Sequence, residues 1–273
     1  MPVKWPYLAC LVLLGALSFY LFYPKIESFF VFYPVSSFAV APEALHLRYK
    51  DVYFAAEDGT RLHGWLFPNK VEVPVLIFCH GNAGNISHRL ENIMLLLEKN
   101  FQVFIFDYRG YGKSAGKPSE QGLYLDGLAA YDYLVQEEQF QPNEIILFGR
   151  SLGAAVAVEV SLKREIRSLI IEGAFLSTKE MAKTMLLFSL LSPVLPTHYD
   201  NLGKIAHVDC PKLIIHGEAD EIIPFAMGKE LFDAATPPKY FYPLNGASHN
   251  DTYVVGGEEY FQSLVAFAKD SRI

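Results

Sequence analysis

The sequence predicts an α/β fold in which helices cover both faces of a mostly parallel sheet. From residue 73 onward, short and nearly continuous apolar runs alternate with longer runs that carry apolar residues at helical spacing. Strands that are apolar at every position are buried on both faces, which is typical of parallel sheets between two layers of helices. Ahead of this region, Asp58-Gly59 joins two strand patterns, so we expect an N-terminal antiparallel hairpin.

The same patterns locate the individual elements. The two hairpin strands are expected at 47–54 and 61–67, and the following strands at 73–79, 101–106, 144–148, 168–171, 211–217 and 239–244. Helices are expected at 86–99, 119–138, 154–160, 225–235 and 258–269, with Ser119 as the N-cap of the second. About forty residues before residue 212 break the alternation, and we interpret them as a small helical cap at about 175–205.

An uncharged apolar segment lies at the N-terminus. The stretch from Trp5 to Tyr23 would span roughly 28 Å as a helix, close to the hydrocarbon thickness of a bilayer, and aromatic residues lie near both of its ends. We interpret residues 1–24 as a single-pass N-terminal membrane anchor, residues 25–44 as a connector, and residues 45–273 as a domain on the extracytoplasmic side. A cleaved signal sequence and a buried core helix are the alternatives for the apolar segment.

The composition argues against several partners. The net charge is −7 and no cluster of five or more Lys or Arg residues occurs, so we expect no nucleic-acid partner. Cys10, Cys79 and Cys210 show no metal-ligand spacing with each other or with histidine, so we expect neither a metal site nor a cofactor. The sequence does not indicate an oligomeric state.

The strongest chemical signal is Gly149-Arg150-Ser151-Leu152-Gly153, which lies between a strand pattern and a helix pattern. In so tight a turn, side chains two positions before and after the serine would clash, which explains both glycines. The turn lifts the serine hydroxyl off the sheet, at the N-terminus of a helix whose free N–H groups favour a developing oxyanion. The pattern is the nucleophile elbow of serine hydrolases and predicts Ser151 as a catalytic nucleophile.

An acid and a histidine follow Ser151 in the order that such hydrolases use. Asp220 comes just after one predicted strand, and His249 lies in the loop after the next strand. We predict that His249 takes the serine proton and returns it to the leaving group, and that Asp220 orients His249. Glu218, two residues before Asp220, is the alternative acid.

Two backbone N–H groups are expected to form the oxyanion hole. One belongs to Leu152, directly after the nucleophile, and the other to Asn82 in the loop after the strand that ends at Cys79. Ala83 is the alternative to Asn82. We interpret His80 as a residue that braces this loop, and Arg109 as one that pairs with an acid to hold the neighbouring loop.

Four motifs together give the chain a family resemblance. They are His-Gly-Asn-Ala-Gly-Asn at 80–85, Asp-Tyr-Arg-Gly-Tyr-Gly at 107–112, Gly-Arg-Ser-Leu-Gly at 149–153 and Gly-Ala-Ser-His-Asn at 246–250. The chain resembles the serine α/β-hydrolase superfamily, and most closely its membrane-anchored single-domain α/β-hydrolase-domain proteins. The resemblance implies an α/β-hydrolase fold over about residues 45–270 and an esterase-, thioesterase- or peptidase-like activity. Depalmitoylating members of the group rely on lipidated, cysteine-rich N-termini, which this chain lacks.

The sequence therefore predicts a serine hydrolase that cleaves an acyl ester, thioester or amide bond through an acyl-enzyme. The apolar stretch at 181–195 predicts that Leu187 and Leu190 bind the acyl chain of a small-molecule or lipid-like substrate, or else that they pack on the sheet. A serine peptidase of the same fold and a catalytically silent, membrane-tethered interaction protein are the alternative functions.

Overall fold

The computed structural model describes residues 5–69 and 74–270, and it divides the chain into two units between Tyr33 and Pro34. The first unit is a single helix, α1 (Trp5–Val31), which continues past residue 24 into the predicted connector. Within the described part of the chain, no helix combines the length and the apolar character that a membrane crossing requires. The anchor at 1–24, of which residues 1–4 lie outside the described residues, stays a prediction.

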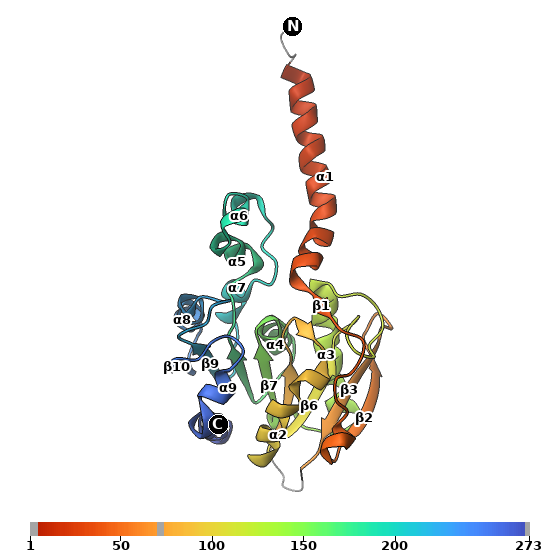
Figure 1. Cartoon of the computed structure of the whole chain (residues 1–273), viewed down its shortest axis with the longest axis vertical. Coiled ribbons are helices and arrows are strands. Elements are labelled where there is room, and N and C mark those ends of the chain that lie inside the picture. Colours follow the sequence, from red (N-terminus) through yellow and green to blue (C-terminus); the bar gives the residue numbers. More distant parts are fainter. Residues whose placement is uncertain (1–4, 70–73, 271–273) are drawn as a thin grey trace. The chain divides into compact units, whose positions relative to one another are not determined.

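An eight-stranded sheet forms the centre of the second unit, in the order β10-β9-β8-β7-β4-β6-β3-β2 (Figure 1). The pairs β2–β3 and β3–β6 are antiparallel, whereas every other neighbouring pair is parallel. This confirms the predicted mostly parallel sheet with an N-terminal hairpin. The strands are β2 (Lys50–Ala55), β3 (Arg61–Phe67), β4 (Val75–Cys79), β6 (Gln102–Asp107), β7 (Ile145–Arg150), β8 (Ser168–Glu172), β9 (Lys212–Gly217) and β10 (Lys239–Leu244).

Helices cover both faces of this sheet, as predicted. Apolar residues of α2 (Leu90–Glu98) and α10 (Gly257–Asp270) form one buried cluster with alternate residues of the central strands. On the other face, α3 (Glu120–Gln136) and α4 (Leu152–Lys163) pack on each other and on β4. Ser119 is the N-cap of α3, as predicted, because its hydroxyl accepts a hydrogen bond from the Gly122 N–H at 3.1 Å.

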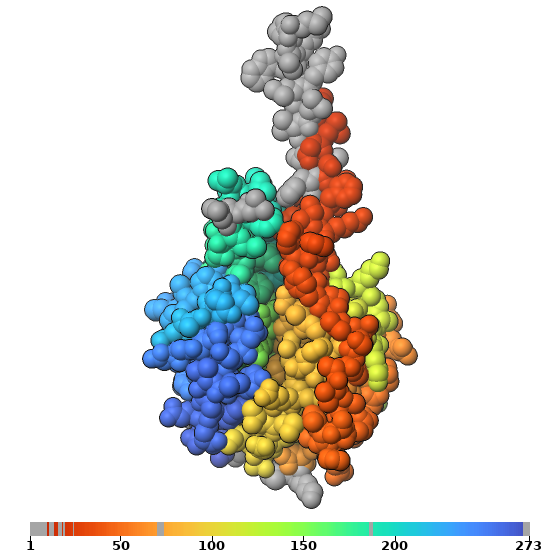
Figure 2. All heavy atoms as spheres, in the orientation of Figure 1, coloured from red at the N-terminus to blue at the C-terminus, as the bar shows by residue number. Residues whose placement is uncertain are grey.

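The segment between β8 and β9 consists of several short helices. These are α5 (Thr178–Thr184), α6 (Leu186–Ser189), the 3-10 turn η4 (Ser192–Val194) and α7 (Asn201–Ile205). Figure 2 shows the part that holds α5 and α6 standing out from the sheet domain. Its exposed apolar side chains are Met185, Leu190, Leu191 and Val194.

Shorter elements complete the chain. The expected helix at 86–99 begins with a 3-10 turn, η2 (Ile86–Arg89), because Asn85 caps the chain there and accepts from the Ser87 N–H. The others are β1 (Tyr33–Pro34), η1 (Pro42–Leu45), β5 (Ala83–Gly84), η3 (Pro142–Glu144), α8 (Phe225–Ala234) and α9 (Thr252–Val255).

Candidate active site

Ser151, Asp220 and His249 meet at the carboxyl edge of the sheet. They follow β7, β9 and β10, and the carboxyl ends of parallel strands lie along one edge. His249 Nδ1 is 2.7 Å from Asp220 Oδ2, and His249 Nε2 is 3.0 Å from Ser151 Oγ. When Nδ1–H donates to the carboxylate, Nε2 is left to accept the serine hydroxyl, which is the arrangement that a general base requires.

The turn at Ser151 is strained in the manner that the sequence predicts. Ser151 has φ +54° and ψ −118°, a left-handed conformation that a serine adopts only where the surrounding structure imposes it. A Cβ on Gly149 would lie 2.5 Å from the Gly153 carbonyl oxygen, and one on Gly153 would lie 1.9 Å from the Cys79 carbonyl oxygen. Glycine at both positions is therefore required by close backbone packing.

The acid is held by more groups than the sequence indicates. Asp220 Oδ1 accepts from the N–H groups of Ile222 and Ile223 at 2.9 and 2.7 Å. The buried His216 lies on the strand that leads to Asp220, and its Nε2 is 3.4 Å from Asp220 Oδ2 and 2.9 Å from the Ile223 carbonyl oxygen. Burial alone would raise the pKa of Asp220, but hydrogen bonds with His216, His249 and the Ile223 N–H hold this pKa well below its usual range.

Sequence reasoning missed His216. Its signal is its position four residues before Asp220, at the end of a buried strand, where the chain turns back on itself. The alternative acid Glu218 is exposed, and its backbone N–H donates to the Leu244 carbonyl oxygen at 2.9 Å. The geometry thus favours Asp220 over Glu218 as the partner of His249.

Both predicted oxyanion donors belong to segments beside the nucleophile. Leu152 is the first residue of α4, so its N–H lies at the N-terminus of that helix. The loop with Asn82 passes close to the serine, because a Cβ on Gly81 would lie 3.6 Å from Ser151 Cβ. The Tyr111 hydroxyl donates to the Asn82 carbonyl oxygen at 2.7 Å and steadies this loop. The donor roles of Asn82 and Leu152 stay predictions.

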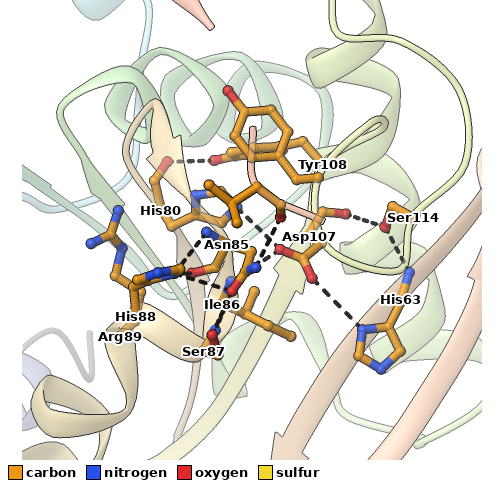
Figure 3. A network of polar contacts seen from close by, with 12 residues as sticks. His63, His80, Asn85, Ile86, Ser87, His88, Arg89, Asp107, Tyr108 and Ser114 are labelled. Atoms are coloured by element: carbon orange, nitrogen blue, oxygen red, sulfur yellow. Dashed lines mark hydrogen bonds and ion pairs between the residues drawn. The ribbon is translucent and has the colours of Figure 1, made fainter. Parts of the chain in front are cut away.

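A buried polar network connects His80 and Ile86, which flank Asn82 in the sequence, with Asp107 and Tyr108 (Figure 3). Asp107 Oδ1 accepts from the Ile86 N–H at 3.0 Å, and the Tyr108 hydroxyl donates to the His80 carbonyl oxygen at 3.0 Å. Burial lowers the pKa of His80 to about 3, so its imidazole carries no charge at ordinary pH. These contacts agree with a bracing role for His80.

Arg109 forms the ion pair expected of it, in a loop that adjoins this network. Its Nη2 is 2.8 Å from Asp126 Oδ1, and its Nη1 is 2.7 Å from Asp58 Oδ2. Asp126 lies on α3 and Asp58 in the hairpin turn between β2 and β3. Arg109 therefore ties the loop after β6 to two other elements.

The two leucines predicted to bind substrate lie in the cap. The Leu190 side chain is 88% exposed, so it does not pack on the sheet. The side chain of Leu187 lies outside the described part of the structure, and its role stays a prediction. Among the described residues, no group of three or more His, Cys, Asp or Glu side chains could hold a metal ion.

Comparisons with known proteins agree with this architecture. The family model described as "Serine aminopeptidase, S33" matches residues 72–206. The chain is 34% identical over 253 residues to the α/β hydrolase domain-containing protein WAV2 of Arabidopsis thaliana, covering 85% of this chain and 82% of that protein. It is 36% identical over 226 residues to an uncharacterized protein of Mycobacterium tuberculosis, covering 82% of this chain and 80% of that protein.

A solved structure shows the same fold. The Pyrococcus furiosus esterase Pf2001 superposes with a TM-score of 0.74 at 23% sequence identity, covering 88% of this chain and 97% of that one. At this identity the similarity concerns the fold alone.

Proposed function

This chain belongs to the serine α/β-hydrolase superfamily, and from that membership we propose that it cleaves an acyl ester or thioester bond with Ser151 as the nucleophile. The observation that carries the proposal is the hydrogen-bonded series Ser151–His249–Asp220, with the serine raised on a strained turn at the end of β7. A catalytically silent protein would have no need to maintain that strain.

The proposed reaction proceeds through an acyl-enzyme. Ser151 Oγ attacks the acyl carbonyl carbon while its proton passes to His249 Nε2, and the Asp220 carboxylate stabilises the imidazolium. The N–H groups of Leu152 and Asn82 stabilise the oxyanion of the tetrahedral intermediate. His249 then protonates the leaving alkoxide or thiolate. His249 then takes a proton from a water molecule as that water attacks the acyl-enzyme, and it gives this proton to Ser151 Oγ as the ester bond breaks and the carboxylic acid leaves.

Active-site labelling combined with a matched substrate series tests this function. The purified full chain should react with a fluorophosphonate probe, and it should hydrolyse an ester and a thioester faster than the amide of the same acyl group. Ser151→Ala should remove both labelling and hydrolysis. Ser161→Ala is the control, because that hydroxyl lies on α4 and donates to the Val158 carbonyl oxygen. Labelling that persists in Ser151→Ala would refute the nucleophile, and faster amide cleavage would indicate a peptidase.

We also propose an acyl substrate that is lipid-like, presented to an enzyme that residues 1–24 hold at a membrane with its catalytic domain on the extracytoplasmic side. The uncharged segment from Trp5 to Tyr23 and the exposed apolar residues of the cap support this. The full chain should stay in the membrane fraction after an alkaline carbonate wash, whereas a chain that begins at Pro34 should be released. Protease added to intact cells should digest the catalytic domain, and protection from that protease would contradict the proposed side.

A further inference from the structure

The buried carboxylate of Glu172 contacts both the segment that carries Ser151 and the segment that carries His249. Glu172 ends β8, which pairs with the nucleophile strand β7. Its backbone carbonyl oxygen accepts the Ser151 N–H at 2.8 Å. Its side chain is 1% exposed, and Oε1 lies 3.0 Å from Nε of Arg150, the residue directly before the nucleophile.

The other side of this network holds the histidine segment. Arg150 Nη2 donates to the His249 carbonyl oxygen at 3.1 Å. The Thr252 hydroxyl, three residues beyond His249, donates to Glu172 Oε1 at 2.7 Å, and the Tyr260 hydroxyl of α10 donates to Oε2. One carboxylate thus receives donors from the nucleophile elbow, from the first residue of α9 and from the C-terminal helix.

The chemistry of these groups indicates that the network affects the positions of the site's segments more than the stability of the fold. Removing a carboxylate and a guanidinium from water costs free energy that their mutual attraction only partly offsets, so apolar residues of similar size could stabilise the fold as well. A guanidinium, however, is planar and presents several N–H groups in fixed directions, so Arg150 can bond Glu172 and the His249 carbonyl oxygen together. Arg150 thereby connects Glu172, on the strand beside the nucleophile strand, with the backbone of His249.

We propose that Glu172 and Arg150 are positioning residues that set the contact between Ser151 Oγ and His249 Nε2. The proposal rests on the function proposed above. Ser151 and His249 come from different strands, and their side chains must meet at 3.0 Å for proton transfer. The Arg150–Glu172 pair connects the backbones of the two segments, so it acts on the reaction through His249 and does not contact the substrate.

Arg164 and Asp132 provide a control pair. The Asp132 carboxylate accepts two hydrogen bonds from Arg164, from Nε at 2.7 Å and from Nη2 at 2.8 Å. Asp132 lies on α3 and Arg164 directly follows α4, and neither of these two bonds reaches Ser151, Asp220, His249 or the Asn82 loop. Asp132→Asn should therefore reproduce the loss of an arginine–carboxylate pair without the loss of positioning.

The test compares Glu172→Gln with Asp132→Asn in the full chain. We measure kcat and KM on one p-nitrophenyl ester, the rate of fluorophosphonate labelling, and the thermal midpoint. In Glu172→Gln, kcat and the labelling rate should fall about 10- to 100-fold with KM within about twofold, because small misplacements of reacting groups have effects of this size. Asp132→Asn should keep kcat and the labelling rate of the folded protein within about twofold.

Two further variants separate positioning from folding. Arg150→Lys keeps a positive charge against Glu172 but cannot bond the His249 carbonyl oxygen in the same way, so kcat should fall while the protein stays folded. In the background of His249→Ala, Glu172→Gln should cause no additional loss, because its effect passes through His249.

The outcomes are distinct for the two proposals. An active wild type with normal kcat in folded Glu172→Gln or in Arg150→Lys overturns the positioning role and leaves the proposed function in place. A multiplicative loss in the double variant also overturns the positioning role. A wild type that neither hydrolyses esters nor reacts with the probe overturns both proposals.

Discussion

Two regions at the carboxyl edge of the sheet differ in how their side chains are held. At the catalytic edge, the side chains of Asp220 and His249 are 1% and 6% exposed, and each makes directed hydrogen bonds. In the cap, Leu190 is 88% exposed and Val194 is 69% exposed. The first region is fixed by backbone geometry and polar contacts, and the second presents apolar surface to its surroundings.

We infer from this difference that the catalytic edge serves the chemical step and that the cap serves substrate selection. Changes at the catalytic edge should alter the rate of the chemical step for every substrate, because they disturb groups that all substrates share. Changes in the cap should alter which acyl chain is preferred and leave the chemical step intact. Variants in each region test this distinction.

The largest effect is expected from the nucleophile and the base. Ser151→Ala and His249→Ala should each lower kcat on all esters by about 10⁴-fold or more, because the members of such a triad act as a unit. Circular dichroism and the thermal midpoint should show a folded protein. If the variants lost activity only on long-chain esters, Ser151 and His249 would act in substrate selection. The proposed distinction between the two regions would then be wrong.

A smaller effect is expected at His216. His216→Leu removes a hydrogen-bond partner of Asp220 and leaves the Ile223 carbonyl oxygen without its donor, so kcat/KM should fall about tenfold on short and long esters alike. Lys212→Met is the control, because Lys212 is buried on the same strand and donates to the Thr236 carbonyl oxygen, away from the acid. Equal kinetic losses in the two variants would show that His216 acts only through stability.

The low pKa of Asp220 predicts a pH dependence of stability. An aspartate titrates at about 3.9 in an unfolded chain, and its pKa is lower in the fold, so its contribution is present above about pH 4 and is lost as pH falls towards the folded value. The quantity to follow is the difference in unfolding free energy between wild type and Asp220→Asn. Below about pH 4 it should shift against the wild type by up to about 1.4 kcal/mol per pH unit. Denaturant unfolding at each pH measures it, and a flat difference down to about pH 3 would contradict the assignment.

The smallest effect is expected in the cap. If Leu190 contacts the acyl chain, activity on p-nitrophenyl esters should rise with chain length, by up to about three- to fourfold per buried methylene. Leu190→Gln should flatten that rise and leave acetate hydrolysis within about twofold. Leu45→Gln, at an exposed leucine outside the cap, should change neither quantity. A maximum at acetate with the same preference in both variants would exclude the acyl-binding role.

Local signals in the sequence were sufficient to predict the fold class and the strands that the three site residues follow. The glycines around Ser151 could be predicted because a tight strand-to-helix turn excludes side chains at those positions whatever surrounds it. The central strands β4, β6, β7, β8 and β9 could be predicted because burial on both faces favours apolar residues at nearly every position. Alternation of strands and helices then places the ends of β7, β9 and β10 at one edge.

The tertiary structure alone decided what holds the site together. Glu172 and Arg150 carry no sequence signal, since an ion pair between neighbouring parallel strands depends on register, and the contact of Arg150 with His249 joins residues 99 positions apart. His216 could not be separated from the other histidines until β9 and the following turn brought it to Asp220. The exposure of Leu190 likewise depends on which face of the cap meets the sheet. Local patterns fix which residues begin and end an element, whereas contacts between distant side chains follow from packing and register.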